Sequence, residues 1–264
     1  MYTTYFKMTD TPFMEKVPVR GIMRDERLNQ GLARLRFMTK HTSLALITGD
    51  AGIGKTSLLR LFMNDLGKNR FRIVYLHITH LRAISLLKSL VSILGERPAH
   101  GKERVMAQIQ TKIQKTEIPT ILLIDEAHLL DPDALVDLRL ILSSAVDEMD
   151  RLQIVLAGHS DIRKELRRSC HESLNQRITV RYHISAMTIT QTHRYIDYHM
   201  QRVNSSGKLF DDQVKNDIYD MSKGIPRLIN NYAALCLLNA AIDNKRRIDT
   251  DVLAKTVNEF HMMG

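Results

Sequence analysis

The octapeptide GDAGIGKT, residues 49–56, decides how the rest of this sequence is interpreted. It fits the pattern G-x-x-x-x-G-K-[ST], and it lies between the apolar run LALIT (44–48) and the amphipathic segment SLLRLFMNDL (57–66). A strand, a glycine-rich turn and a helix in this order direct several backbone N–H groups toward one point, where the helix N-terminus adds partial positive charge. The stretch therefore predicts a loop that binds the phosphates of a nucleotide.

The loop residues have separate expected roles. Lys55 is expected to reach the β- and γ-phosphates of ATP, and the Thr56 hydroxyl to hold Mg²⁺. The residues expected to surround the nucleotide are Gly49, Asp50, Ala51, Gly52, Ile53, Gly54, Lys55, Thr56 and Ser57, together with Asp125.

A second stretch, ILLIDEAH (121–128), supplies carboxylates at the end of an apolar strand. We expect Asp125 to hold Mg²⁺, with Thr56, and Glu126 to orient or deprotonate the attacking water. Asp125 alone could equally cap the next helix, but together with GDAGIGKT it indicates ATP hydrolysis. The letters DEAH also name a helicase family. About 200 residues follow GDAGIGKT, too few for a second α/β lobe beside a helical region, so His128 is interpreted as incidental to hydrolysis.

Composition narrows the class of protein. The 264 residues are 44% hydrophobic and 25% charged, as in ordinary globular proteins. No apolar run reaches the roughly 18 residues that span a bilayer, and the N-terminus lacks the apolar core of a signal peptide. Two distant cysteines fit a reducing, cytoplasmic location. A net charge of +9 favours a polyanionic partner such as nucleic acid.

The pattern along the chain predicts two domains. Apolar runs at 44–48, 71–76, 121–124, 153–157 and 178–184 alternate with segments of helical periodicity, which predicts an α/β domain (1–186) with a parallel five-stranded sheet flanked by helices. Helical segments alone follow, at about 190–203, 212–222, 226–243 and 250–260. They predict a small all-helical lid domain (187–264).

Three further stretches complete a resemblance to a known family: QIVLAGHS (153–160), LNQRITVRY (174–182) and GIPRLINN (224–231). In this order and spacing the motifs resemble the AAA+ ATPases. With the N-terminal Pro12-Phe13, the similarity is closest to the ExeA-type AAA+ family, from about Thr11 to Phe260. That family includes a secretion ATPase and transposition regulators akin to TniB, TnsC, MuB and IstB.

The resemblance implies further site residues. Arg177 would be an arginine finger that reaches the γ-phosphate of a neighbouring subunit, with Arg181 as the rival for this role. Arg227 would be the sensor-2 arginine, which acts on the nucleotide of its own subunit. His159 would take the sensor-1 position, where relatives often carry Gln or another amide.

The resemblance also implies partners. Secretion members carry a membrane segment and a further C-terminal domain, whereas this chain stops at Gly264, which favours a stand-alone transposition regulator. Such a protein would form a ring or helical filament of identical subunits on double-stranded DNA with ATP, recruit or activate a transposase, and need no membrane. The expected DNA contacts are Arg82, Lys88, Lys102 and Arg104, although a solvated helix face explains any single one of them.

Two other functions remain open. One is a secretion-type ATPase, and the other is a nucleotide switch of the STAND type. STAND proteins tend to show G-L-P-L where this chain has GIPRL, so Arg227 favours a hydrolytic ATPase.

Overall fold

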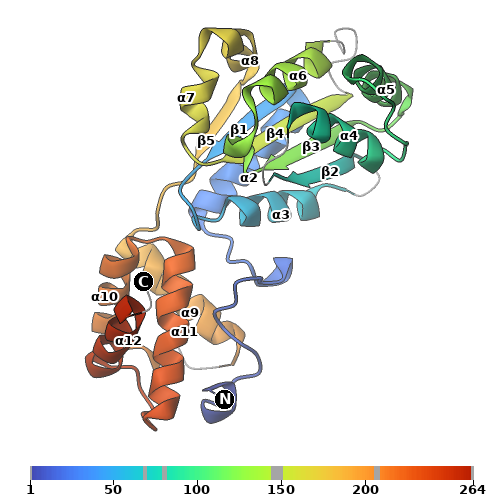
Figure 1. The fold of residues 1–264 in the computed structure, drawn as a ribbon. Helices are drawn as coiled ribbons and strands as arrows, with labels where there is room; N and C mark the ends of the chain where they lie inside the picture. The colour runs from blue at the N-terminus through green and yellow to red at the C-terminus, as the bar shows by residue number, and fades with distance from the viewer. Residues whose placement is uncertain (1, 68–69, 79–81, 144–150, 205–208, 263–264) are drawn as a thin grey trace. The chain divides into compact units, whose positions relative to one another are not determined.

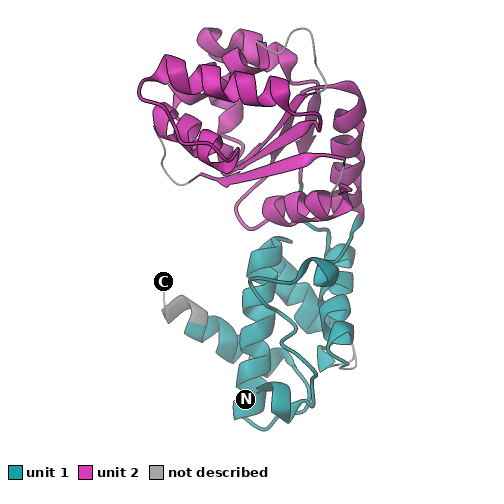
Figure 2. Cartoon of the chain, turned by 90° about the vertical axis from the view of Figure 1, so that its right-hand side faces the viewer, with its two compact units in different colours: residues 1–25, 185–264 teal, residues 26–184 magenta. Residues whose placement is uncertain are grey.

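The computed structural model describes residues 2–67, 70–78, 82–143, 151–204 and 209–262. It divides into two compact units, which Figure 2 shows in different colours. One unit is Glu26–Ile184, and the other combines Met1–Asp25 with Ser185–Gly264.

The first unit is built on a five-stranded sheet in which every neighbouring pair of strands is parallel. The strands are β1 (Leu44–Thr48), β2 (Arg72–His77), β3 (Thr120–Asp125), β4 (Leu152–Gly158) and β5 (Val180–His183). Their order in the sheet is β2-β3-β4-β1-β5. The carboxyl ends of β1, β3 and β4 are therefore neighbours, and all three phosphate-site motifs leave the sheet there. The last strand, Val180–His183, is shorter than the apolar run 178–184 from which it was expected.

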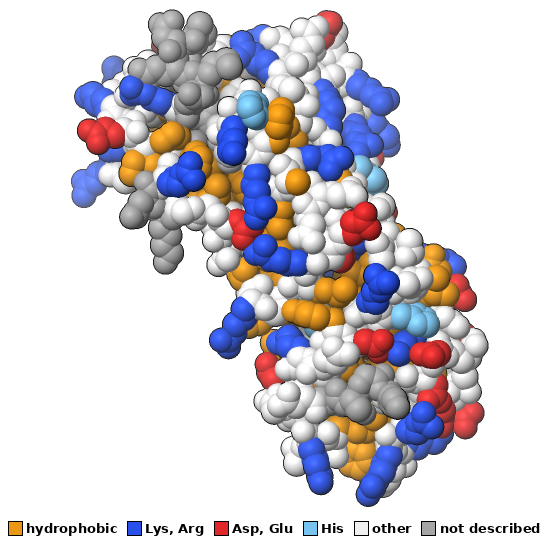
Figure 3. All heavy atoms as spheres, turned by 180° about the vertical axis from the view of Figure 1, so that it is seen from behind, with side chains coloured by type: hydrophobic (Ala, Val, Ile, Leu, Met, Phe, Trp, Pro, Cys, Tyr) orange, Lys and Arg blue, Asp and Glu red, His pale blue; other side chains and the backbone are white. Residues whose placement is uncertain are grey.

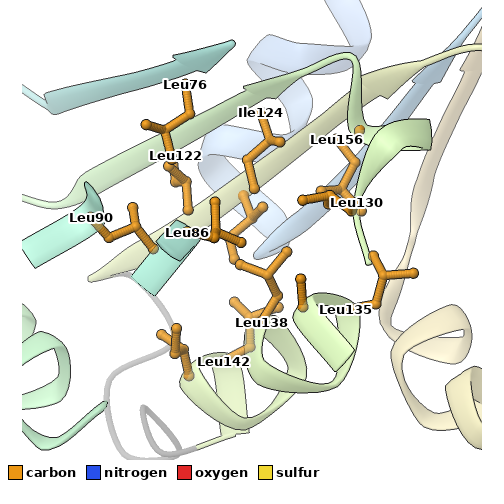
Figure 4. Packing of buried hydrophobic residues seen from close by; sticks show 14 of the residues in the cluster. Leu76, Leu86, Leu90, Leu122, Ile124, Leu130, Leu135, Leu138, Leu142 and Leu156 are labelled. Carbon is orange, nitrogen blue, oxygen red and sulfur yellow. The ribbon is translucent and has the colours of Figure 1, made fainter. Parts of the chain in front are cut away.

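Helices cover both faces of this sheet (Figure 1). Those of the unit are α2 (Glu26–His41), α3 (Lys55–Asp65), α4 (Ala83–Ile93), α5 (Lys102–Lys115), α6 (Pro132–Ser143), α7 (Ile162–Leu166) and α8 (Glu172–Arg177), with 3₁₀ turns η2 (Ala127–Leu129) and η3 (Ser169–His171). Leucines of α4 and α6 meet the central strands in one apolar core (Figure 4). Because β1, β3 and β4 are buried along their whole length, they appear in the sequence as mostly apolar runs.

The second unit is helical. It contains α1 (Tyr2–Tyr5), η1 (Val19–Gly21), α9 (Ile189–Arg202), α10 (Asp212–Ser222), α11 (Pro226–Ile242) and α12 (Thr250–Met262). Local signals account for several boundaries. Thr188 and Gln191 form a reciprocal capping box at the start of α9, and Pro226 occupies the first turn of α11. None of the described helices is long and apolar enough to cross a bilayer.

The first 25 residues belong to the helical unit and not to the α/β domain in which the sequence placed them. Phe13 is buried there against Phe210, with ring centroids 6.1 Å apart. His199 Nδ1 lies 3.0 Å from the Pro12 carbonyl oxygen, and Arg202 donates to the carbonyls of Thr11 and Pro12. Burial lowers the pKa of His199 to about 4, so the ring is neutral and donates its Nδ1 proton to Pro12.

Candidate nucleotide site

The loop 49–56 connects β1 to α3 as its motif requires. Gly52 and Gly54 adopt positive φ angles of 74° and 111°, which other residues rarely take. Gly49 is needed for space, because a Cβ there would lie 2.9 Å from the Ile184 carbonyl oxygen. The buried Lys55 ammonium donates to the carbonyls of Gly49 and Asp50, at 3.0 and 2.9 Å, and so lies over the start of its own loop.

Asp125 ends β3 and is fully buried. Its Oδ2 accepts hydrogen bonds from Thr56 Oγ1 at 2.7 Å and from the Tyr75 hydroxyl at 3.0 Å, and its Oδ1 accepts from the Glu126 N–H at 3.0 Å. The structure thus brings Thr56 and Asp125 together, as both motifs predict. The Tyr75 contact was not predicted. A hydroxyl flanked by the apolar Val74 and Leu76, in the strand next to β3, is the signal that the sequence offers for it.

The pair of Thr56 and Asp125 fits Mg²⁺. A hydroxyl and a carboxylate oxygen are hard ligands of the kind this ion prefers, and Mg²⁺ usually takes only one or two protein groups beside phosphates and water. Accordingly, the described residues contain no cluster of three acidic, His or Cys side chains that would hold a metal unaided. Burial, and then the Asp125 charge, raise the pKa of Tyr75, so its hydroxyl stays a donor to Asp125.

Glu126 follows in the left-handed conformation, with φ 56° and ψ 36°. This conformation carries a cost for a residue with a side chain, and it turns the chain sharply from β3 into η2. Glu126 is 31% exposed, and its Oε2 lies 3.4 Å from Nδ1 of His128. A half-exposed carboxylate beside the buried Asp125 is placed to accept a proton from a water molecule.

His159 stands directly after β4, beside the phosphate loop. Its Nε2 lies 3.7 Å from Asp50 Oδ1, and its Nδ1 lies 2.8 Å from Asp161 Oδ2. Hydrogen bonds from Lys164 and then from His159 lower the pKa of Asp161, which stays ionised as a partner for the ring. The polar side chain expected after this strand is therefore present at the loop.

The two candidate finger arginines differ in their surroundings. Both are exposed, but the Arg181 guanidinium donates to the backbone oxygen and to Oδ1 of Asn175, at 2.5 and 2.8 Å. Arg177 ends α8, and no hydrogen bond or ion pair is recorded for its guanidinium among the described residues. This difference favours Arg177 as the arginine available to a second molecule.

Arg227 lies in the first turn of α11, in the helical unit, and is exposed. The turn before it depends on Gly224, whose φ is 72° and where a Cβ would lie 2.1 Å from the Met187 carbonyl oxygen.

The basic residues expected to contact DNA also differ. Arg82, Lys88 and Arg104 are exposed. Arg82 directly precedes α4, Lys88 lies on α4 and Arg104 lies on α5. Lys102 instead pairs with Asp137, a carboxylate only 1% exposed, at 2.7 Å. A lysine that compensates a buried charge is poorly suited to a phosphate contact. Figure 3, which views the molecule from behind, shows Lys and Arg side chains scattered over that side rather than gathered in one closed patch.

Comparisons with known proteins address the fold and the class of this chain. Residues 38–166 match the family model described as AAA domain, a segment that contains all three phosphate-site motifs. General secretion pathway protein A of Aeromonas hydrophila is 27% identical over 256 residues, which cover 94% of this chain and 46% of that protein. This chain therefore spans less than half the length of that relative.

Solved structures show the same fold. The Aeropyrum pernix ORC1 protein in complex with DNA superposes with a TM-score of 0.70 at 16% identity, over 92% of this chain and 67% of that one. Cdc6p from Pyrobaculum aerophilum gives 0.70 at 18% identity, over 97% and 70%. The predictions of a P-loop AAA+ fold with a parallel five-stranded sheet, and of an ATPase, are confirmed.

Proposed function

We propose that this P-loop ATPase of AAA+ type hydrolyses ATP to control its own assembly within a secretion-type complex. The observation that carries the proposal is the similarity to general secretion pathway protein A, which extends over 94% of this chain and so includes the helical unit. The sequence favoured a transposition regulator that acts on a transposase. No such similarity supports that function or that partner. The end of the chain at Gly264 no longer argues for it, because the chain spans only part of its relative.

Within one subunit, Lys55 would bind the β- and γ-phosphates and stabilise the charge that develops there. Thr56 and Asp125 would hold Mg²⁺, which neutralises phosphate charge when bound. Glu126 would orient the attacking water and accept its proton. His159 would contact the γ-phosphate or this water from the end of β4.

Two arginines would complete the reaction. Arg177 would reach the γ-phosphate bound by a neighbouring copy, because its exposed guanidinium is the one not engaged by Asn175. Arg227 would act on the nucleotide of its own chain. Hydrolysis then depends on subunit contact, and assembly on the nucleotide.

The proposal is tested by sedimentation of the protein with ATP, with a non-hydrolysable analogue and without nucleotide. We expect larger species with the analogue and none for Lys55→Ala. Assembly of Lys55→Ala equal to that of the wild type would contradict it.

Binding of duplex DNA is a second candidate, favoured by the charge of +9 and by the fold shared with a DNA-bound ORC1 structure. It is tested by the salt dependence of DNA binding with nucleotide bound. The double variant Lys88→Glu, Arg104→Glu should weaken binding about tenfold or more and flatten its salt dependence. Lys102 is left unchanged because it pairs with Asp137. An unaltered affinity for DNA would show that the surface carrying Lys88 and Arg104 does not bind DNA.

A further inference from the structure

His128, set aside as incidental in the sequence, lies beside the carboxylate proposed as the general base. The left-handed Glu126 starts the η2 turn, which closes with a hydrogen bond from Leu129 N–H to the Glu126 carbonyl at 2.9 Å. This turn folds the His128 ring back, so that its Nδ1 lies 3.4 Å from Glu126 Oε2.

The same ring atom has a second partner. The backbone N–H of His159 donates to His128 Nδ1 at 3.3 Å. A neutral imidazole carries its proton on one nitrogen only, so Nδ1 either accepts from His159 or donates to Glu126. The two contacts therefore exclude each other, although both partners lie within reach of the ring.

The close approach of the His128 ring to β4 depends on Gly158. A Cβ at this residue would lie 2.9 Å from the His128 backbone nitrogen and 3.3 Å from its Nδ1. The strand that Gly158 ends continues into His159, whose ring faces Asp50 of the phosphate loop. Contacts thus run from the phosphate loop through His159 and His128 to Glu126.

We propose that His128 is a positioning residue for Glu126, and that the position of the His159 turn decides whether Nδ1 is available to it. With its Nδ1 lone pair accepting from His159, the ring has no Nδ1 proton to donate to Glu126 and gives the carboxylate no fixed direction. When the His159 turn shifts toward a bound phosphate, Nδ1 is released. The ring then changes tautomer through solvent, with Nδ1 gaining a proton and Nε2 losing one, and the new Nδ1–H donates to Glu126 and orients it toward the water. The inference rests on the proposed role of Glu126 as the base.

Three substitutions at residue 128 test this role through steady-state ATP hydrolysis. His128→Ala should lower kcat about tenfold with little change in KM, because the base is misdirected while nucleotide binding is intact. His128→Asn should restore most of kcat, since its amide places a donor or acceptor where Nδ1 lies. His128→Gln should not, because its longer side chain places the amide nearer to the position of Nε2. Equal rates for Asn and Gln, or an unchanged kcat for Ala, would overturn the proposal.

A double-mutant cycle separates positioning from a structural role. Glu126→Gln should lower kcat about 100-fold or more, and His128→Ala should add little in that background, because no base remains to be oriented. Independent, multiplying effects would contradict the proposal. If Glu126→Gln itself keeps normal activity, the proposed mechanism fails first. If it is inactive while His128→Ala is normal, only the inference about His128 fails.

Discussion

Two turns of this molecule share one local pattern and differ in their surroundings. GDAGIGKT in the α/β unit and SKGIPR in the helical unit each place a positive-φ glycine before a helix that carries a basic residue in its first turn. Lys55 is buried and bonded to its own loop, whereas Arg227 is exposed. The difference indicates that the phosphate loop and its lysine are positioned by contacts within the α/β unit. Among the described residues, no hydrogen bond or ion pair is shown for the exposed Arg227 guanidinium.

The largest expected effect comes from substitution of the buried Lys55. Lys55→Ala removes the cation nearest the loop, so we expect kcat/KM for ATP to fall about 10³-fold or more. Calorimetric titration with ATP and steady-state hydrolysis measure it. The variant should remain folded, and nucleotide binding of normal strength would show that Lys55 is not a phosphate ligand.

Substitution of Gly224, the glycine of the turn before Arg227, is expected to destabilise the fold. Gly224→Ala combines a positive φ with a Cβ 2.1 Å from a carbonyl oxygen, and should lower the free energy of unfolding by about 3 kcal/mol. Gly101→Ala is the matched control, because its φ is 88° with nothing within 4 Å of the added Cβ. It should cost about 1 kcal/mol. Denaturant unfolding measures both, and equal losses would contradict the steric reading of Gly224.

Arg227 itself should matter to the reaction and not to the fold. Arg227→Ala is expected to lower kcat about tenfold without a change in Tm. Arg246→Ala, another exposed arginine of the helical unit, should leave both quantities unchanged. A stability loss for Arg227→Ala, with the rate unaffected, would assign this residue to the fold of the turn.

The smallest effect concerns Tyr75, which supports the buried side of the site. Tyr75→Phe removes one hydrogen bond to Asp125 but leaves the Thr56 bond in place, so we expect a loss of about 1 kcal/mol in the free energy of unfolding and a few-fold rise in KM for Mg²⁺. A titration of activity with Mg²⁺ measures the second quantity. No change in either would show that the hydrogen bonds from Thr56 and from the Glu126 N–H fix Asp125 without Tyr75.

The sequence predicted most of the α/β unit because its signals are local. Buried strands appear as apolar runs, and the motifs GDAGIGKT and DEAH predict the elements directly beside them. Contacts between distant residues left no such signal. Pro12 and His199 are 187 positions apart, so nothing local showed that the first 25 residues pack with the C-terminal helices. The Tyr75, His128 and Lys102 contacts were missed for the same reason, because each depends on which elements become neighbours in space.

The most direct test of the central claim mixes two inactive variants. Glu126→Gln keeps Arg177 but lacks the base, and Arg177→Ala keeps the base but lacks the proposed finger. If Arg177 acts on a neighbouring subunit, the equimolar mixture should recover ATP hydrolysis to about a quarter of the wild-type rate, because that share of subunit contacts pairs an intact base with an intact finger. A mixture no more active than the sum of its two components would contradict an active site shared between subunits.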